Sequence, residues 1–284
     1  MASWALVARL GSSPVDAAIG WGGLATSLIL VGVAVALAHW QGLRLEGEIL
    51  WASLRAIVQL LAVGYVLVVL LDPDTPVIFA WCWVAAMIGF SALTVRRRAP
   101  EVPGMASLAV FALLASAAVS LGVVFGLGVY PTVGRAIVPI AGMMIGNSIG
   151  GLVVAARRII AELSERRDEI EARLALGLTW QDASKPFVRS ALRTALTSQI
   201  ESTKAVGLVF LPGAMTGLIL AGAKPVDAVL VQAALMYLIL GCVATNVVIV
   251  GLGLTRRLFT DDHRLVPLPR TREAMVPTIE RPRR

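Results

Sequence analysis

Few polar side chains lie inside the apolar stretches of this sequence, so each one is a candidate for function. Asn147 interrupts the apolar run 136–156, and an amide inside a membrane needs a hydrogen-bonding partner or water. Packing between helices and a transport path would both satisfy it. Glu201 and Lys204 stand just before the run 205–223, where they can pair with each other or with Arg55.

Two further polar residues share one side of the run 49–71. Arg55 lies six residues inside it, about 9 Å from its end at a rise of about 1.5 Å per residue, so its guanidinium can reach the headgroups. Gln59 follows one turn later on the same face, where it can hydrogen-bond to another helix. Both are candidates for a translocation path.

The run 205–223 contains a break at Pro212-Gly213. Proline inside a helix frees backbone carbonyls, and interrupted helices at mid-membrane are frequent at transport sites. Close packing through rows of small residues is the alternative, and two rows are present: Gly142, Gly146, Gly150 and Gly213, Gly217, Ala221. Met215 lies beside the break, and its thioether can pack or bind a soft metal.

Several kinds of chemistry have no residues to support them. The sequence has no GxxxxGK[ST] phosphate-binding loop and therefore no P-loop site for ATP. It has no HExxH motif, and its two histidines make a histidine-built metal centre improbable. The cores of the apolar runs contain no aspartate or glutamate, unlike many proton-coupled carriers, so we expect the energy source to lie on another chain.

The composition identifies the class of protein. Of 284 residues, 57% are hydrophobic and 15% charged, and the mean hydropathy is +0.81. Soluble domains are about 25% charged. These values predict an all-α polytopic membrane protein, and the net charge of +7 then indicates basic loops in the cytoplasm and no nucleic-acid partner.

Seven apolar runs are long enough to cross a bilayer, which takes about 20 residues. They cover 17–38, 49–71, 77–95, 105–130, 136–156, 205–223 and 228–254. Arginines gather at 96–98, in the segment 157–204 and after residue 255. Basic loops stay in the cytoplasm, which predicts that the N-terminus lies outside and the C-terminus inside. Residues 1–254 then form a membrane domain, and 255–284 a mobile basic tail able to touch anionic lipid.

The segment 157–204 is expected to form a helix, a sharp turn and a second helix on the cytoplasmic face. Glu162/Arg166 and Glu169/Arg173 have the acid-before-base spacing of an exposed helix. Gly177 can end that helix in a left-handed cap, and Thr179 begins a capping box for the next one. A short helix held by two spans can serve as a handle for a partner.

Part of this segment is similar to the Glu-Ala-Ala loop by which ABC-transporter permeases contact their ATPase. Glu171-Ala172 is followed by Gly177 and Trp180, although Arg173 replaces the second alanine of the motif. A solvated connector is the other interpretation of these residues.

Several longer stretches resemble FetB-type ABC permeases, a bacterial iron-export family with plant aluminium-tolerance relatives. The resemblance covers about residues 24–255 and rests on ILWASLRAIVQL at 49–60, VPIAGMMIGN at 138–147, LALG at 174–177 and KAVGLVFLPGAMTG at 204–217. The chain departs from the family at 200–202, where Ile-Glu-Ser replaces a stretch that often holds Asn or Asp.

The resemblance implies a permease that acts as a homodimer with a separate ABC-type ATP-binding subunit. ATP and magnesium would bind that partner, no cofactor would bind this chain, and the exported substrate would be iron or another metal ion. The metal ligands stay unknown. A seven-span receptor or accessory membrane protein without transport is the alternative.

Overall fold

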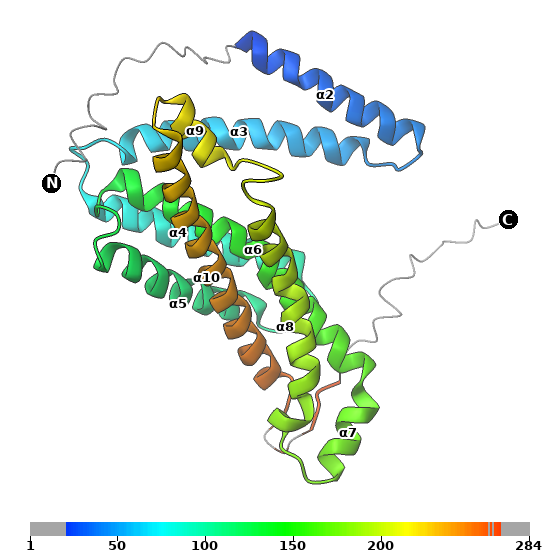
Figure 1. Cartoon of the computed structure of the whole chain (residues 1–284). Coiled ribbons are helices and arrows are strands. Elements are labelled where there is room, and N and C mark those ends of the chain that lie inside the picture. Colours follow the sequence, from blue (N-terminus) through cyan, green and yellow to red (C-terminus); the bar gives the residue numbers. More distant parts are fainter. Residues whose placement is uncertain (1–20, 261, 263, 268–284) are drawn as a thin grey trace.

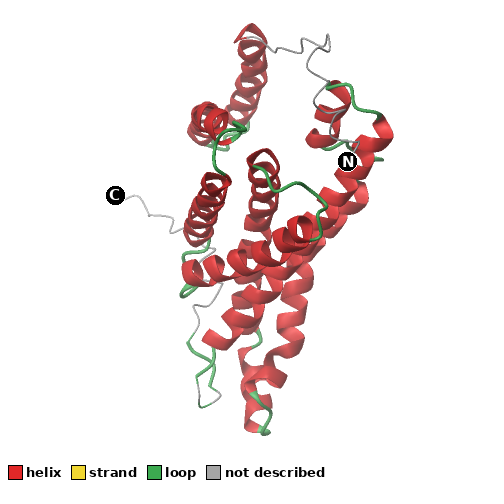
Figure 2. Ribbon diagram, turned by 90° about the vertical axis from the view of Figure 1, so that its left-hand side faces the viewer, coloured by secondary structure: helices red, strands yellow, loops and turns green. Residues whose placement is uncertain are grey.

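The computed structural model describes residues 21–260, 262 and 264–267, and these form a bundle of helices (Figures 1 and 2). The first four are α2 (Trp21–Trp40), α3 (Glu46–Leu70), α4 (Val77–Arg98) and α5 (Met105–Gly126). The remaining five are α6 (Gly134–Glu165), α7 (Arg167–Ala175), α8 (Trp180–Ala205), α9 (Gly213–Leu220) and α10 (Pro225–Arg257). The prediction of an all-α polytopic membrane protein is confirmed.

Six of the described helices are long and apolar enough to span a membrane: α2, α3, α4, α5, α6 and α10. They correspond to six of the seven apolar runs. The residues before 21, which include the start of the first run, lie outside the described residues. All of these helices except α5 are longer than their apolar runs on at least one side, because the polar residues that flank a span continue its hydrogen-bonded turns. α5 ends at Gly126, four residues before the end of its run.

The run 205–223 is not a single helix, and its interruption is longer than the break expected at Pro212-Gly213. α8 ends at Ala205, α9 begins only at Gly213, and α9 has just 8 residues. Gly207 has φ of +88°, a left-handed conformation that favours glycine, and Pro212 caps α9. Residues 206–212 therefore separate two helices, α8 before the break and α9 after it. α8 is too polar to be counted among the apolar spans.

The core of the bundle lies where α6, α8 and α10 meet, with α4 and α5 packed beside them (Figure 1). α6 and α10 run in parallel, since Ser148 of α6 accepts a hydrogen bond from Asn246 of α10 at 3.0 Å. α8 runs antiparallel to both. Its Ala195 packs with Val243 and Val247 of α10, while its Leu192 lies further along, against Gly251.

Close approach of the helices depends on glycines outside the two expected rows. A Cβ at Gly151 would lie 3.1 Å from Val243, and one at Gly251 would lie 2.5 Å from Leu192. In the expected row, by contrast, a Cβ at Gly146 or Gly150 would meet no atom within 4 Å. That glycine face of α6 is open within a single chain.

α2 and α3 form a helical hairpin that is attached to the bundle mainly at one end. They lie across the top of Figure 1, and only 6% of the most apolar 18-residue window of each is buried. The attachment is at the end of α3, where Leu70 is buried and Arg135 donates a hydrogen bond to the carbonyl of Leu71 at 2.7 Å. The apolar sides of both helices therefore face lipid or another chain.

α4 and α10 end at the level where α6 reaches Arg157. We call this level the basic end of the molecule and define it by Arg96–Arg98, Arg157, Arg256 and Arg257. Arg157 pairs with Glu101 at 2.9 Å, and Arg257 donates to the carbonyl of Gly104 at 2.7 Å. These contacts join the three helices at this level. α6 continues past this level to Glu165, where α7 folds back against it.

The chain just after α10 is packed, whereas the whole of 255–284 was expected to be a mobile tail. Leu258, Phe259 and Leu265 are buried, and the backbone N–H of Val266 donates to the carbonyl of Leu258 at 2.9 Å. Arg167 of α7 also reaches the carbonyl of Leu265 at 3.4 Å. Residues 268–284 lie outside the described residues.

Candidate functional site

The turn between α7 and α8 has the geometry that the sequence predicts. Gly177 has φ of +88°, and the N–H of Leu178 donates to the carbonyl of Arg173 at 3.2 Å, as in a glycine-capped helix end. Thr179 caps α8 by accepting a hydrogen bond from the N–H of Asp182. We call α7, this turn and the first turn of α8 the handle.

The expected ion pairs on this segment form only in part. Glu169 pairs with Arg173 at 2.8 Å as expected, but Glu162 pairs with Arg158 at 3.1 Å and not with Arg166. Arg166 is the C-cap residue of α6, and its side chain pairs with Glu169 at 3.7 Å instead.

The outer side of the handle is exposed. Ala172 and Gly177 face solvent, Leu176 is 81% exposed, and Glu171 pairs with Arg167 at 2.6 Å. The inner side is anchored by Ile170, which is fully buried. Three of the four coupling residues expected from the sequence, Glu171, Ala172 and Gly177, therefore lie on one exposed protrusion.

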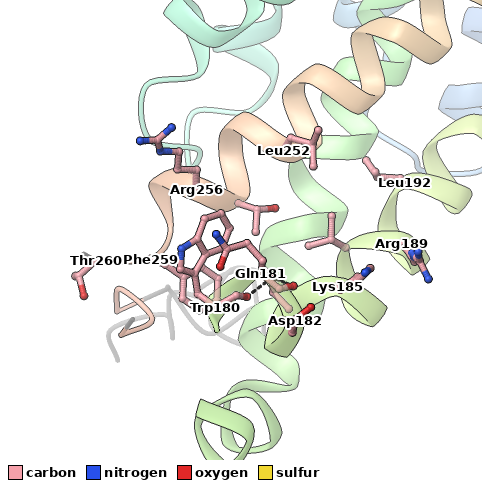
Figure 3. Close-up of a pocket in the computed structure, with 13 residues that line it drawn as sticks. Trp180, Gln181, Asp182, Lys185, Arg189, Leu192, Leu252, Arg256, Phe259 and Thr260 are labelled. Carbon is pink, nitrogen blue, oxygen red and sulfur yellow. Dashed lines mark hydrogen bonds between the residues drawn. The ribbon is translucent and has the colours of Figure 1, made fainter. Parts of the chain in front are cut away.

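Trp180 differs from the other coupling residues because it points inward. It is half-buried, and its ring stacks on Phe259 with centroids 5.7 Å apart (Figure 3). The handle is thus joined to the residues that follow α10.

One face of α8 is polar and exposed over the half that enters the bundle. Its exposed polar residues recur at helical spacing: Arg193, Thr194, Thr197, Ser198, Glu201 and Ser202. Glu201 lies nine residues beyond Leu192, or about 14 Å, which places it level with Cys242 near the middle of α10. Glu201 pairs with Lys204 at 2.9 Å, and both side chains are at least 60% exposed.

Asn147 lies on α6 near the level of Glu201, since the neighbouring Ser148 bonds to Asn246 and lies 3.6 Å from Cys242. Its amide donates to the carbonyl of Met143 at 2.7 Å and its side chain is exposed. Met143, one turn earlier on α6, packs against the buried cluster of Ala195, Ile239 and Val243 between α6, α8 and α10. Asn147 therefore uses its own helix for one hydrogen bond and keeps its oxygen free to face outward.

Arg55 and Gln59 lie on a different side of the molecule. Gln59 lines a cleft of about 520 Å³ between α3, α4 and α6, whose other wall includes Gly142 and Gly146. Arg55 is exposed, and no carboxylate of the described residues lies within ion-pair distance of it. The expected alternative of an Arg55–Glu201 pair does not form within one chain.

The break at Pro212-Gly213 lies next to a second cavity. This cavity, of about 840 Å³, lies between α9, α6 and α10 and extends from Tyr130 to Met143. Met215 is half-buried on α9 but does not line it.

The structure thus brings the expected coupling residues together but divides the expected path residues among four helices, α3, α6, α8 and α9. No hydrogen bond or ion pair joins Asn147, Glu201 and Met215 to one another. Among the described residues there is no cluster of three or more His, Cys, Asp or Glu side chains able to hold a metal ion.

Sequence reasoning missed a buried polar cluster in the centre of the bundle. Asn246 donates to Ser148 at 3.0 Å, and the thiol of Cys242 lies 3.6 Å from both Ser148 and Ser116. All four side chains are at most 1% exposed, and the Oδ1 atom of Asn246 has no hydrogen-bond partner among the described residues. The available signal was the amide of Asn246 in the long apolar run 228–254.

Comparisons with known proteins agree with this architecture. The profile of the "Uncharacterised protein family (UPF0014)" matches residues 21–259. The chain is 36% identical over 214 residues to the "UPF0014 membrane protein STAR2" of Oryza sativa subsp. japonica, covering 75% of this chain and 74% of that protein. No solved structure matches the chain.

Two bacterial relatives match over more of their length. The "Probable iron export permease protein FetB" of Escherichia coli (strain K12) is 32% identical over 244 residues, covering 86% of this chain and 93% of that protein. The "UPF0014 membrane protein YjkA" of Bacillus subtilis (strain 168) is 34% identical over 242 residues, covering 85% and 96%. The profile and the relatives together span the whole helical bundle, and the chain therefore belongs to the UPF0014 family of membrane proteins.

Proposed function

We propose that this chain is the membrane permease of an ABC transporter that exports a metal ion, with iron as the first candidate. Two copies form the transport path between them, and a separate ABC-type subunit binds and hydrolyses ATP. The N-terminus lies outside and the basic end in the cytoplasm of the plasma (bacterial inner) membrane.

The observation that carries the proposal is the exposed polar face of α8, which lies level with the middle of α10, a helix long and apolar enough to span a membrane. A charged side chain at the bilayer centre costs about 2.5–3.5 kcal/mol on insertion scales, so such residues face protein or a water-filled cavity. Within one chain nothing covers Thr197, Ser198 and Glu201. A second copy placed against this face would remove it from lipid and line a polar path.

The open glycine face of α6 supports the same arrangement. Gly146 and Gly150 have no neighbour within 4 Å, and small residues allow close approach of helices in membranes. Because Asn147 stands between these glycines, a partner helix that packed there would also meet its amide.

The handle supports coupling to an ATPase. It is rigid, it protrudes from the basic end, and it exposes Leu176 and Gly177. Motion of a partner bound there would reach the bundle through α8, which begins at the handle and continues to Ala205.

The choice of iron rests on the printed name of one relative, the probable iron export permease of Escherichia coli. Along the proposed path, the side chains offer a carboxylate at Glu201, an amide at Asn147 and a thioether at Met215. Carboxylate and amide oxygens suit hard cations. In this proposal the ion contacts these side chains one after another, and no single site binds it with several ligands.

Export by the full chain expressed with its ATPase tests the path. We expect Glu201→Gln to lower iron efflux several-fold at equal expression, because the carboxylate faces the path. The matched control is Glu165→Gln, which removes an exposed carboxylate at the end of α6 and should leave efflux unchanged. Equal efflux in both variants would remove Glu201 from the path.

Co-purification of the ATPase tests the handle separately. Gly177→Ile forces a β-branched residue to adopt φ of +88°, so we expect the ATPase to be lost from the complex. Gly222→Ile introduces the same strain at φ of +89° in the turn between α9 and α10 and should retain it. A chain that binds no ATPase and changes no metal content would instead be an accessory or receptor protein.

A further inference from the structure

A groove at the basic end lies between the start of α8 and the end of α10. Its volume is about 790 Å³, and Figure 3 shows the side chains that line it. Leu192 and Leu252 form the part nearest the membrane-spanning region, and Leu252 is 62% exposed. The opposite part is formed by the stacked rings of Trp180 and Phe259.

Three cations surround the middle of this groove. Lys185 and Arg189 come from successive turns of α8, and Arg256 comes from the last turn of α10. All three are exposed, and none has an ion-pair partner among the described residues. The groove also contains one carboxylate, Asp182, which accepts a hydrogen bond from the hydroxyl of Thr179 at 2.9 Å.

The lack of ion-pair partners in the groove contrasts with the pairing of the other basic side chains around the handle. Arg157, Arg158, Arg167 and Arg173 each bind a glutamate. The groove therefore retains an excess of two positive charges over Asp182, and it has no internal anion to neutralise them.

The order of the groove's lining matches the order of groups in a phospholipid. Arg256 lies four residues, or about 6 Å, beyond Leu252, so the cations follow directly on the apolar part. Arg256 is adjacent to Arg257, which binds the loop after Arg96–Arg98 and so fixes this level as that of the basic end. Basic pockets between membrane helices bind anionic headgroups, and tryptophan rings favour the interface.

We propose that this groove binds one anionic phospholipid, with its phosphate among Lys185, Arg189 and Arg256 and an acyl chain along Leu192 and Leu252. The lipid would lie against Trp180 and Phe259, the residues that join the handle to the end of α10. The site depends on the chain spanning a membrane and not on what the chain transports.

Native mass spectrometry of the full chain in detergent, titrated with phosphatidylglycerol or phosphatidylcholine, tests this site. We expect one tightly retained phosphatidylglycerol and no comparable phosphatidylcholine. The variant Lys185→Gln/Arg189→Gln/Arg256→Gln should bind phosphatidylglycerol about 100-fold more weakly, since each basic residue near a charged lipid contributes about a fivefold effect. The control Arg96→Gln/Arg97→Gln/Arg98→Gln removes three exposed cations at the same level and should change the affinity less than twofold.

Several outcomes would overturn the proposal. An equal loss in both triple variants would mean general attraction to the basic end, and an unchanged affinity in the groove variant would mean that lipid binds elsewhere. Displacement by 20 mM inorganic phosphate or glycerol phosphate would identify a site for a soluble anion. Full lipid retention with loss of ATPase co-purification in the groove variant would assign the groove to a protein partner.

Discussion

The buried cluster of Ser116, Ser148, Cys242 and Asn246 shows how single polar residues hold three membrane helices in register. Ser116 belongs to α5, Ser148 to α6, and the other two to α10. Hydrogen bonds between membrane helices contribute about 0.6 kcal/mol on average, so the cluster specifies which faces meet more than it adds stability.

The reactivity of Cys242 should report this packing. Its thiol is 1% exposed, whereas Cys82 is exposed on α4. In a Cys82→Ala chain we expect a thiol-reactive fluorophore in detergent to react only when heating unfolds the bundle. Rapid labelling of the folded chain would contradict the burial of Cys242.

Removal of one hydroxyl from the cluster should lower stability slightly. Ser148→Ala takes away the acceptor of the Asn246 amide and leaves a buried donor with fewer partners, at a cost of about 1 kcal/mol. Ser120→Ala is the control, because Ser120 is half-buried on α5 and makes no described hydrogen bond. The unfolding midpoint measured in the same detergent should fall for the first variant and stay constant for the second.

At the scale of the elements, glycine determines where helices touch, and spacing alone does not identify the glycines that matter. The row Gly142, Gly146, Gly150 has the expected period, yet the tight contacts occur at Gly134, Gly151 and Gly251. A sequence shows which residues are small, but which side of a helix faces a neighbour depends on the packing of the whole bundle.

Gly134→Ala should loosen the junction between α3 and α6. A Cβ there would lie 2.6 Å from the carbonyl oxygen of Leu70, and backbone must move to admit it, at a cost of about 1–3 kcal/mol. Gly122→Ala on α5 meets no atom within 4 Å and should be neutral or stabilising, because alanine favours helix. Equal unfolding midpoints would show that the α2–α3 hairpin is not held at this point.

Hydropathy predicted six of the described spans because their apolar runs are long, and local rules predicted the turn at Gly177 and the cap at Thr179. The same reasoning failed for α8. Its inner half contains Thr197, Ser198 and Glu201, so a hydropathy profile assigns it to a loop, although Ala191 and Ala195 on its other face are buried. An amphipathic helix that faces water or a second copy inside a membrane cannot be distinguished by mean hydropathy from a surface helix.

At the scale of the whole molecule, the described residues of one chain leave three surfaces without a partner: the polar face of α8, the glycine face of α6 and the open face of the α2–α3 hairpin. The core of α4, α5, α6, α8 and α10 is closed and packed. The uncovered polar face is the feature that a second copy would complete in the proposed homodimer.

Disulfide cross-linking in membranes should detect that second copy. In a Cys82→Ala chain, we expect Ser198→Cys on the polar face of α8 to give covalent dimers under mild oxidation. Phe111→Cys, on a side of α5 that is 63% exposed at the parent residue, should give none because that side faces lipid. Dimers at position 111 only would place the interface elsewhere.

The continuity of α8 has a mechanical consequence. Between Trp180 at the handle and Glu201 in the bundle, α8 is one uninterrupted helix of 21 steps, or about 32 Å, and the chain becomes non-helical only after Ala205. It can therefore act as a lever that pivots at the handle. A tilt of about 10° about Trp180 would displace Glu201 by about 5 Å, so a small rotation of the handle would become a much larger movement of the Glu201 carboxylate.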